Sequence, residues 1–502
     1  MELPREYNAA VDLIGRNAGR GSKVAFIDDS GTCTFLQLAE RVDRAANALR
    51  SLGIQRENRI AIAMLDSVDW VALFLGAIKA GIVPVALNTL LTPSDYEYQL
   101  KDSRARALFV SEPLLKSFEP IRKNCPDLEH VVSNVKDFIS AGAPNAKAAP
   151  TLRDDMCFWL YSSGSTGAPK GTVHLHSHLI LTAELYAKPV LGIRESDLVF
   201  SAAKLFFAYG LGNAMTFPLS VGATTILMAE RPTPDAVFKR LTEKKPTVFF
   251  GVPTLYAGML ASANFPEKKN LALRICVSAG EALPPTIGNT FTERTGVEIL
   301  DGIGSTEMLH IFLSNRPGEV RYGTTGKPVP GYELRLVDEQ GGMITRPDEL
   351  GELQISGPTS AIMYWTQREK TKNTFQGPWT RSGDKYSRDK DGYYTYGGRS
   401  DDMLKVGGIY VSPVEVEMAL SSHEAVLEAA VVGKEDESKL VKPKAYVVLK
   451  SGNSPDEKLK TALQQHVKAK LAPYKYPRWI EFLNELPKTA TGKIQRFKLR
   501  RD

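Results

Sequence analysis

Strand-like and helix-like segments alternate along the chain, and this alternation constrains the fold more than any other feature. Candidate strands and helices follow one another at 58–65, 69–80, 82–87, 93–101 and 107–110. This βαβαβ order is typical of a mainly parallel sheet covered by helices. The alternation returns between residues 234 and 285. Beyond residue 320 the strands are short and separated by glycines, which predicts antiparallel hairpins.

The apolar stretch from Trp70 to Leu87 is about long enough to span a membrane. Lys79, Gly81 and Pro84 interrupt it, so we expect a helix, a glycine stop and a strand instead. The first ten residues lack the apolar core of a secretory signal. The four cysteines are scattered without metal-ligand spacing, and a chain of 502 residues needs no disulfide to build its core. These features favour a reduced, cytoplasmic location.

The stretch YSSGSTGAPKG, residues 161–171, lies between two apolar segments that read as strands, 156–160 and 171–175. Small residues let backbone N–H groups approach a polyanion, hydroxyl groups add donors, and Lys170 adds a cation. The pattern therefore predicts a phosphate-binding loop. It is not the G-x-x-x-x-G-K-[ST] loop, because Pro169 precedes the lysine and Gly171 follows it.

This string resembles the nucleotide phosphate-binding loop of the adenylate-forming enzymes, which include acyl-CoA and aryl-CoA ligases, firefly luciferase and the adenylation domains of peptide synthetases. The resemblance covers nearly the whole chain. It implies that ATP phosphates contact Ser162, Ser163, Gly164, Ser165, Thr166, Gly167 and Lys170.

Later motifs occur in the order that this family shows. DGIGSTE, residues 301–307, resembles the nucleotide and magnesium motif, in which Thr306 would bind the α-phosphate and Glu307 the Mg²⁺ ion. A carboxylate is a suitable hard ligand for Mg²⁺ beside phosphates. By the same resemblance the nucleotide-binding set includes Asp301, Gly302 and Ile303, and the adenine pocket includes Ala279, Gly280 and Glu281. Many relatives carry an aromatic residue in place of Ile303, so an aliphatic contact would replace adenine stacking.

The ribose and hinge motifs come next. WTRSGDKY, residues 379–386, implies that Asp384 holds the ribose hydroxyls, together with Arg399. The segment 397–417 resembles the family's hinge, with Asp401 as the pivot. Further family positions fall on Lys405, Gly407 and Gly408 in a loop that would swing toward the CoA thiol, on Tyr474 and Arg478 near CoA, and on the catalytic lysine, Lys493. Tyr476 stands where some relatives have arginine.

Two segments bear on the acid that is activated. Residues 201–219 and 302–315 resemble benzoate-CoA ligases and hydroxybenzoate-CoA ligases more than fatty-acyl enzymes. The resemblance implies a flat, short slot for an aromatic acid, lined by Ala208, Tyr209, Gly304, His310 and Ile311. We expect Phe206 and Phe207 to pack in the core.

The run HLHSH, residues 174–178, suggests a metal site at first sight. A metal site needs a convergent set with a further ligand, and the run lies where a predicted strand enters a helix. We therefore expect these histidines to be structural.

The net charge is +6, and the segment from 402 to the end holds 18 Lys and Arg against 13 Asp and Glu. Such a basic segment could bind nucleic acid, form a solvated surface or make a rim for a phosphorylated small molecule. No RNA-binding motif or helix-turn-helix pattern accompanies it. We expect a small-molecule aromatic carboxylate as the partner, with no nucleic acid or membrane, and a monomer or homodimer.

The sequence thus predicts an α/β fold. A large N-terminal domain, residues 1–400, would combine stacked, mostly parallel sheets with an antiparallel part. A small mobile α+β domain, residues 401–502, would carry Lys493. With ATP, Mg²⁺ and coenzyme A, the expected reaction is activation of benzoate through an aryl-adenylate. A preference for 4-hydroxybenzoate, delivery to a carrier protein, or nucleotide or nucleic-acid binding without catalysis remain alternatives.

Overall fold

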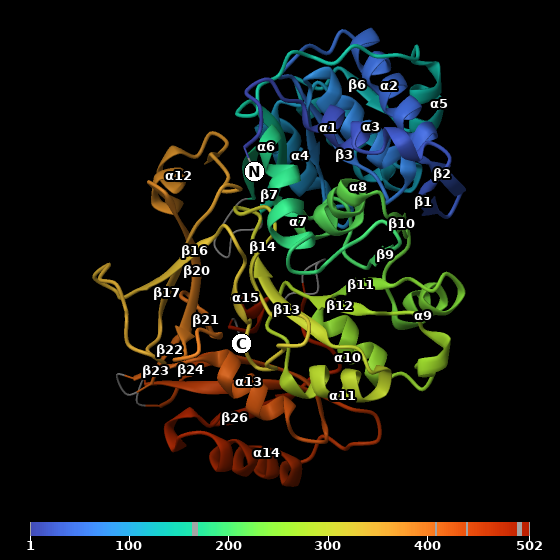
Figure 1. Cartoon of the computed structure of the whole chain (residues 1–502). Helices are drawn as coiled ribbons and strands as arrows, with labels where there is room; N and C mark the ends of the chain where they lie inside the picture. Colours follow the sequence, from blue (N-terminus) through green and yellow to red (C-terminus); the bar gives the residue numbers. More distant parts are fainter. Residues whose placement is uncertain (1, 163–168, 407–408, 438–439, 489–493, 501–502) are drawn as a thin grey trace.

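The computed structural model describes residues 2–162, 169–406, 409–437, 440–488 and 494–500. Two large sheets dominate these residues, and smaller sheets, antiparallel except for one parallel pair, follow them in the chain (Figure 1). The expected α/β class, with parallel and antiparallel sheets, is confirmed.

The first large sheet has seven strands and is mostly parallel. In spatial order they are β18 (Met363–Tyr364), β8 (Lys170–Leu175), β7 (Met156–Ser162), β4 (Val83–Ala86), β3 (Arg59–Ala63), β5 (Ala107–Val110) and β6 (His130–Val132). Its helices are α2 (Phe35–Ser51), α3 (Val68–Ala80), α4 (Pro93–Ser103) and α5 (Val135–Ala141). The predicted phosphate loop therefore joins β7 to β8, which pair antiparallel.

The segment that could have spanned a membrane forms α3, a glycine cap and β4, as the sequence predicted. The hydroxyl of Ser67 accepts a hydrogen bond from the N–H of Trp70 and begins the helix. Gly81 ends it with a φ of 76°, a left-handed conformation that favours glycine. In the described part of the chain, no helix combines the length and apolarity needed to cross a bilayer.

The second large sheet has nine strands. They are β15 (Lys327–Pro328), β14 (Ile311–Ser314), β13 (Ile299–Gly304), β12 (Ile275–Ser278), β11 (Val248–Gly251), β9 (Leu198–Ser201), β10 (Thr224–Ile226), β1 (Val24–Asp28) and β2 (Gly31–Thr34). Helices of this region are α1 (Ala9–Gly15), α6 (His176–Thr182), α7 (Ala208–Leu211), α8 (Phe217–Val221), α9 (Pro234–Glu243), α10 (Pro253–Ala261) and α11 (Pro285–Thr295).

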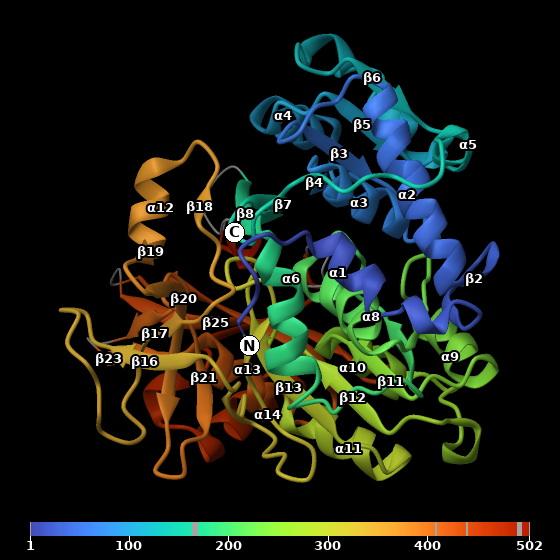
Figure 2. The same ribbon diagram turned by 45° about the horizontal axis from the view of Figure 1, so that its top comes forward.

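Strand periodicity assigns the buried side chains to separate cores. Ile60 and Ile62 face a core shared by both sheets, with α2 and α3 in it, whereas the alternate residues Ala61 and Ala63 face a second core under α4. A third core lies between the nine-stranded sheet and helices α9 to α11. The two large sheets thus lie on either side of one common core (Figure 2).

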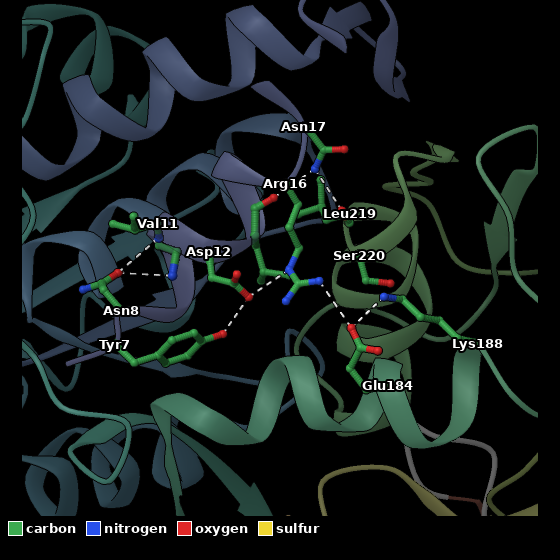
Figure 3. Close-up of polar contacts among 12 residues, drawn as sticks. Tyr7, Asn8, Val11, Asp12, Arg16, Asn17, Glu184, Lys188, Leu219 and Ser220 are labelled. Carbon is green, nitrogen blue, oxygen red and sulfur yellow. Dashed lines mark hydrogen bonds and ion pairs between the residues drawn. The ribbon is translucent and has the colours of Figure 1, made fainter. Parts of the chain in front are cut away.

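A polar network fastens α1 to the helices of the common core (Figure 3). Arg16 donates from Nε to Asp12 Oδ2 at 2.9 Å and from Nη1 to Glu184 Oε1 at 3.3 Å. Lys188 donates to the same Glu184 oxygen at 2.6 Å. Glu184 lies in a π-helical turn, Ala183–Ala187, that continues α6. The N-terminal segment therefore supports a helix that also contributes to the candidate site.

The rest of the chain builds smaller sheets. A five-stranded antiparallel sheet contains β16 (Glu333–Val337), β17 (Gly351–Ser356), β19 (Phe375–Gln376), β20 (Trp379–Arg388) and β21 (Tyr394–Arg399), with α12 (Arg368–Thr374) beside it. The last part has β22 (Leu404–Val406), β23 (Ile409–Val411), α13 (Pro413–Ser421), β24 (Val426–Glu435), β25 (Val441–Leu449), α14 (Glu457–Lys470), β26 (Trp479–Phe482) and α15 (Arg496–Leu499). Its buried residues form cores of their own.

Candidate active site

A lysine, a tyrosine and a glutamate meet where the seven-stranded sheet faces the end of β13. Lys170 Nζ donates to the hydroxyl of Tyr364 at 3.3 Å, and this hydroxyl donates to Glu307 Oε1 at 2.7 Å. Lys170 Nζ and Glu307 Oε1 are 4.0 Å apart, and their side chains are only 19% and 16% exposed. The cluster places the cation of the predicted phosphate loop beside the predicted magnesium ligand.

The protonation of this cluster follows from its burial. Burial lowers the pKa of Lys170, and the negative charge of Glu307 opposes this shift. Burial raises the pKa of Tyr364, and the adjacent Glu307 carboxylate raises it further. Tyr364 is therefore a neutral hydroxyl that can donate to the carboxylate at neutral pH.

The turn that carries Thr306 and Glu307 is held from several sides. The N–H of Ala361 donates to the carbonyl of Glu307 at 2.7 Å, and the N–H of Leu309 donates to the carbonyl of Thr306 at 3.2 Å. Leu309 has a φ of 66°, which is uncommon outside glycine. A Cβ atom on Gly304 would lie 2.6 Å from the carbonyl oxygen of His310, so only glycine fits there.

The expected adenine segment, Ala279 to Glu281, directly follows β12, and Asp301 lies opposite Ser278 on the neighbouring β13. Burial raises the pKa of Asp301 well above its usual value, while the N–H groups of Leu283 and Gly302 act against this shift. Within the described ranges its Oδ1 has no hydrogen-bond partner. Asp301 thus places a buried polar atom near the expected adenine segment, in which Gly280 is exposed. Gly302 is buried beside Asp301, and Ile303 is partly buried.

Glu281 also contacts the far end of the chain. Its Oε1 accepts a hydrogen bond from the N–H of Ile494 at 2.9 Å. This contact joins residues 213 positions apart and brings the start of the last described segment to the nine-stranded sheet. Helix α15, which follows Ile494, is drawn near the centre of the molecule (Figure 1).

The expected ribose residues lie opposite each other on the β20–β21 hairpin, because Asp384 pairs with Arg399 in its register. Arg399 donates from Nη1 to Asp384 Oδ1 at 3.3 Å, and its Nε lies 3.4 Å from Asp401 Oδ1. Burial alone would lower the pKa of Arg399, but the carboxylates of Asp384 and Asp401 outweigh it and the pKa is raised. A Cβ atom on Gly383, whose φ is 73°, would lie 2.8 Å from the guanidinium.

Aromatic rings surround His310 in the expected acid pocket. The centroid of its ring lies 4.4 Å from Phe217, 5.6 Å from Tyr186 and 5.7 Å from Tyr209. Its Nε2 donates to Asn213 Oδ1 at 3.1 Å and lies 3.3 Å from the carbonyl of Tyr209. Burial lowers the pKa of His310 to about 3, so its imidazole is neutral.

Two π-helical turns flank this pocket, Ala183–Ala187 with Tyr186 and Gly212–Thr216 with Asn213. Such turns often occur at functional sites. Ala208 and Tyr209 are partly exposed next to the second of them, and Ile311 is buried. Phe206 is buried against Phe207, with ring centroids 4.4 Å apart, as expected for core packing.

Tyr474 and Arg478, which we expect near CoA, lie between α14 and β26. The guanidinium carbon of Arg478 lies 3.8 Å from the ring centroid of Tyr476, and Lys468 Nζ lies 4.1 Å from the same ring. Tyr474 packs against the core of the last part of the chain. Lys475 instead bonds both oxygens of Glu415 at 2.7 Å. The side chains of Arg478 and Lys468 thus both contact the Tyr476 ring and make the surface between α14 and β26 basic.

Several predicted site residues lie outside the described residues, namely Ser163, Gly164, Ser165, Thr166, Gly167, Gly407, Gly408 and Lys493. Ser162, at the end of β7, is buried. The backbone of Lys405 pairs with Tyr410 in the β22–β23 hairpin.

Sequence reasoning missed Tyr364, Asn213 and the contact partners of Thr306. Tyr364 reaches Glu307 because β18 pairs with β8 at Thr172. No local sequence pattern predicts this pairing. His174 was assigned a structural role, yet its Nε2 lies 2.8 Å from the carbonyl of Thr306. In the described part of the chain, no three His, Cys, Asp or Glu side chains gather as a metal site.

Comparisons with known proteins agree with this geometry. The family model for AMP-binding enzymes matches residues 15–365, and that for the AMP-binding enzyme C-terminal domain matches 415–493. The chain is 63% identical to a benzoate–CoA ligase of Thauera aromatica, covering all of this chain and 97% of that protein. It is 49% identical to a 4-hydroxybenzoate–CoA/benzoate–CoA ligase of Rhodopseudomonas palustris, covering 99% and 94%. The crystal structure of a benzoate CoA ligase from Burkholderia xenovorans LB400 superposes with a TM-score of 0.94 at 58% identity, over 98% of this chain and 100% of that one.

Proposed function

This chain belongs to the AMP-binding enzyme family and is an ATP-dependent aryl-CoA ligase, and we propose that benzoate is the acid it prefers. ATP and coenzyme A are its co-substrates. The observation that supports benzoate best is the cluster of aromatic rings that Tyr209, His310 and Phe217 form at the expected acid site. Activity with 4-hydroxybenzoate is the second candidate, because a buried ring hydroxyl needs a hydrogen-bond partner and the relative from Rhodopseudomonas palustris is named for both acids.

The reaction has two steps. A benzoate oxygen attacks the α-phosphorus of ATP, the bond to the β-phosphate oxygen breaks, and pyrophosphate leaves. The CoA sulfur then attacks the carbonyl carbon of the benzoyl-adenylate, the bond to the phosphate oxygen of AMP breaks, and the thiol proton passes to solvent. The first step joins two anions, so charge stabilisation dominates its catalysis.

Several residues near the phosphates contribute to this charge stabilisation. Lys170 supplies a cation, and Thr306 contributes its hydroxyl to the α-phosphate. Glu307 is suited to Mg²⁺, because its carboxylate is a hard oxygen donor that lies beside a phosphate loop, and Mg²⁺ commonly binds one or two carboxylates together with substrate phosphates. Bound there, Mg²⁺ would neutralise phosphate charge. Tyr364 keeps the carboxylate oriented toward this position.

The remaining residues bind and orient the substrates. Asp384 and Arg399 hold the ribose, and the segment from Ala279 to Glu281 lines the adenine with Asp301. The two-domain division is part of the proposal, with residues 1–400 binding ATP and the acid. Residues 401–502 carry Lys493, and their separate cores support a unit that moves about Asp401.

Substrate choice gives the first test. We expect benzoate to have the highest kcat/KM in a panel assayed for CoA-dependent AMP formation, with small or para-hydroxylated rings accepted. Decanoate should be slower by about 100-fold or more, because the bulky rings packed around His310 leave little room for a long chain. Hexanoate is the matched aliphatic control of shorter length. Comparable kcat/KM values for decanoate and benzoate would contradict the proposal, and adenylate formation without CoA use would favour a carrier protein as acceptor.

The basic surface at Arg478 gives a second test, of CoA binding. Arg478→Glu should raise the KM for CoA by about three- to tenfold, because it reverses a partly screened charge next to a phosphorylated ligand. Pyrophosphate exchange, which needs no CoA, should be unchanged. Arg346→Glu, at an exposed arginine that pairs with Glu349, is the control and should leave both values unchanged. An unaltered KM for CoA in Arg478→Glu would remove this residue from the CoA site.

A further inference from the structure

Two buried histidines of the HLHSH run lie directly behind the turn that carries Thr306 and Glu307. His174 is 0% exposed and His178 is 2% exposed. His174 Nε2 lies 2.8 Å from the carbonyl oxygen of Thr306, and the Nδ1 atoms of the two rings are 3.0 Å apart. The pair therefore connects α6 and β8 to the turn through side chains that reach no solvent.

The hydrogen-bond partners fix the tautomer of both rings. A carbonyl oxygen only accepts, so His174 Nε2 carries a hydrogen and donates it to Thr306. In the neutral ring Nδ1 of His174 is then an acceptor, and the hydrogen between the two rings belongs to Nδ1 of His178. The N–H of Leu175 also approaches that nitrogen, but at 3.4 Å, so the shorter 3.0 Å contact between the rings decides the tautomer. Phe158 stacks on His174 at 5.3 Å and fixes the plane of its ring.

The strand β8 gives this contact its relation to the phosphate site. Side chains at positions i and i+4 of a strand point to the same face, so Lys170 and His174 both face the end of β13. Lys170 lies near the Glu307 carboxylate and His174 bonds the preceding carbonyl, that of Thr306. One strand therefore contacts two consecutive residues of the turn.

We propose that His174 is a positioning residue for adenylate formation, which holds the Thr306–Glu307 turn in place through the Thr306 carbonyl, with His178 setting its tautomer. The inference rests on the proposed roles of Thr306 and Glu307. Without the His174 donor, the turn keeps its contacts to Ala361 and Tyr364. The Thr306 carbonyl keeps the N–H of Leu309 at 3.2 Å but loses its shorter hydrogen bond, the one from β8. Partners that orient ligands in this way typically change metal affinity or activity by about 10- to 100-fold when removed.

The test compares His174→Leu with His174→Gln in pyrophosphate exchange at varied Mg²⁺. The leucine variant should lower kcat by about 10- to 100-fold and raise the Mg²⁺ concentration needed for half-maximal exchange. The glutamine variant keeps an N–H that can reach the Thr306 carbonyl, so it should recover most of the rate. His176→Leu is the matched control. This histidine is buried in the same run, but its Nδ1 accepts from the N–H of Ala9, so its loss should leave the Mg²⁺ dependence unchanged.

A second pair of variants covers the case in which His174→Leu does not fold. His178→Asn keeps a donor toward His174 and should stay near the wild-type rate, whereas His178→Leu frees the tautomer and should lose part of it. The inference would be overturned if His174→Gln were no better than His174→Leu, or if His176→Leu shifted the Mg²⁺ dependence as strongly. Absence of benzoate-dependent exchange in the wild type would overturn the proposed function itself, and this inference with it.

Discussion

Glu307→Gln is expected to slow benzoate-dependent pyrophosphate exchange by about 100- to 1000-fold. In the structure the hydroxyl of Tyr364 donates to Glu307 Oε1 at 2.7 Å. The glutamine keeps an oxygen that can accept this hydrogen bond, so the shape of the cluster is preserved. It removes the negative charge that lies 4.0 Å from Lys170 and that would bind Mg²⁺ between the protein and the phosphates. The loss should therefore fall on the chemistry of the first step, with a raised requirement for Mg²⁺.

A variant at Tyr364 separates the charge of the Glu307 carboxylate from its orientation, and a variant at Glu352 serves as the control. Tyr364→Phe removes the hydroxyl but leaves the charge, and it should cost less than Glu307→Gln in the same exchange assay. Glu352→Gln removes a carboxylate that pairs with Arg381 on the β17–β20 ladder, and it should leave exchange unaltered. An exchange rate of Glu307→Gln within about threefold of the wild type would exclude Glu307 from catalysis, because one well-placed charged group is worth far more.

The sequence predicted the parts of this fold that depend on local chemistry. The helix, glycine stop and strand from Val68 to Ala86 follow from an apolar run that Lys79, Gly81 and Pro84 interrupt, and from the preference of glycine for a left-handed φ. The two strands around the phosphate loop, β7 and β8, likewise follow from short apolar runs on either side of glycines and serines. Local patterns of this kind determine which residues form an element.

The contacts that complete the site depend on pairings between distant segments. Tyr364 approaches Glu307 because β18 adds to β8, with Tyr364 opposite Thr172, 192 positions away in the sequence. The HLHSH run was interpreted as structural, which its burial supports, but nothing local shows that His174 reaches Thr306. Glu281 was expected at the adenine, and the structure adds its bond to Ile494. Spacing within a motif predicts chemistry, whereas the neighbours of a motif arise only from the packed sheets.

The contact between Glu281 and Ile494 bears on the two half-reactions. Ile494 follows Lys493 in the sequence, and its N–H donates to Glu281 Oε1, just after β12 of the nine-stranded sheet, at 2.9 Å. The β22–β23 hairpin, which includes Lys405 of the expected CoA loop, is labelled at the lower left, whereas α15, which follows Ile494, is labelled near the centre (Figure 1). We infer that this arrangement serves adenylate formation, and that a rotation about Asp401 exchanges the two segments for the thiol step.

Lys493→Ala is therefore expected to suppress benzoyl-adenylate formation by roughly 100-fold or more, because a cation is needed where the benzoate and phosphate anions meet. The same variant should still convert supplied benzoyl-adenylate and CoA to the thioester, because the adenylate bond already exists in that step. Lys488→Ala is the matched control. Its ammonium bonds Glu428 at 2.6 Å within the small domain, so its loss should leave the ratio of the two half-reactions unchanged. An equal slowing of both half-reactions by Lys493→Ala would contradict the two-orientation mechanism, since one orientation would then serve both steps.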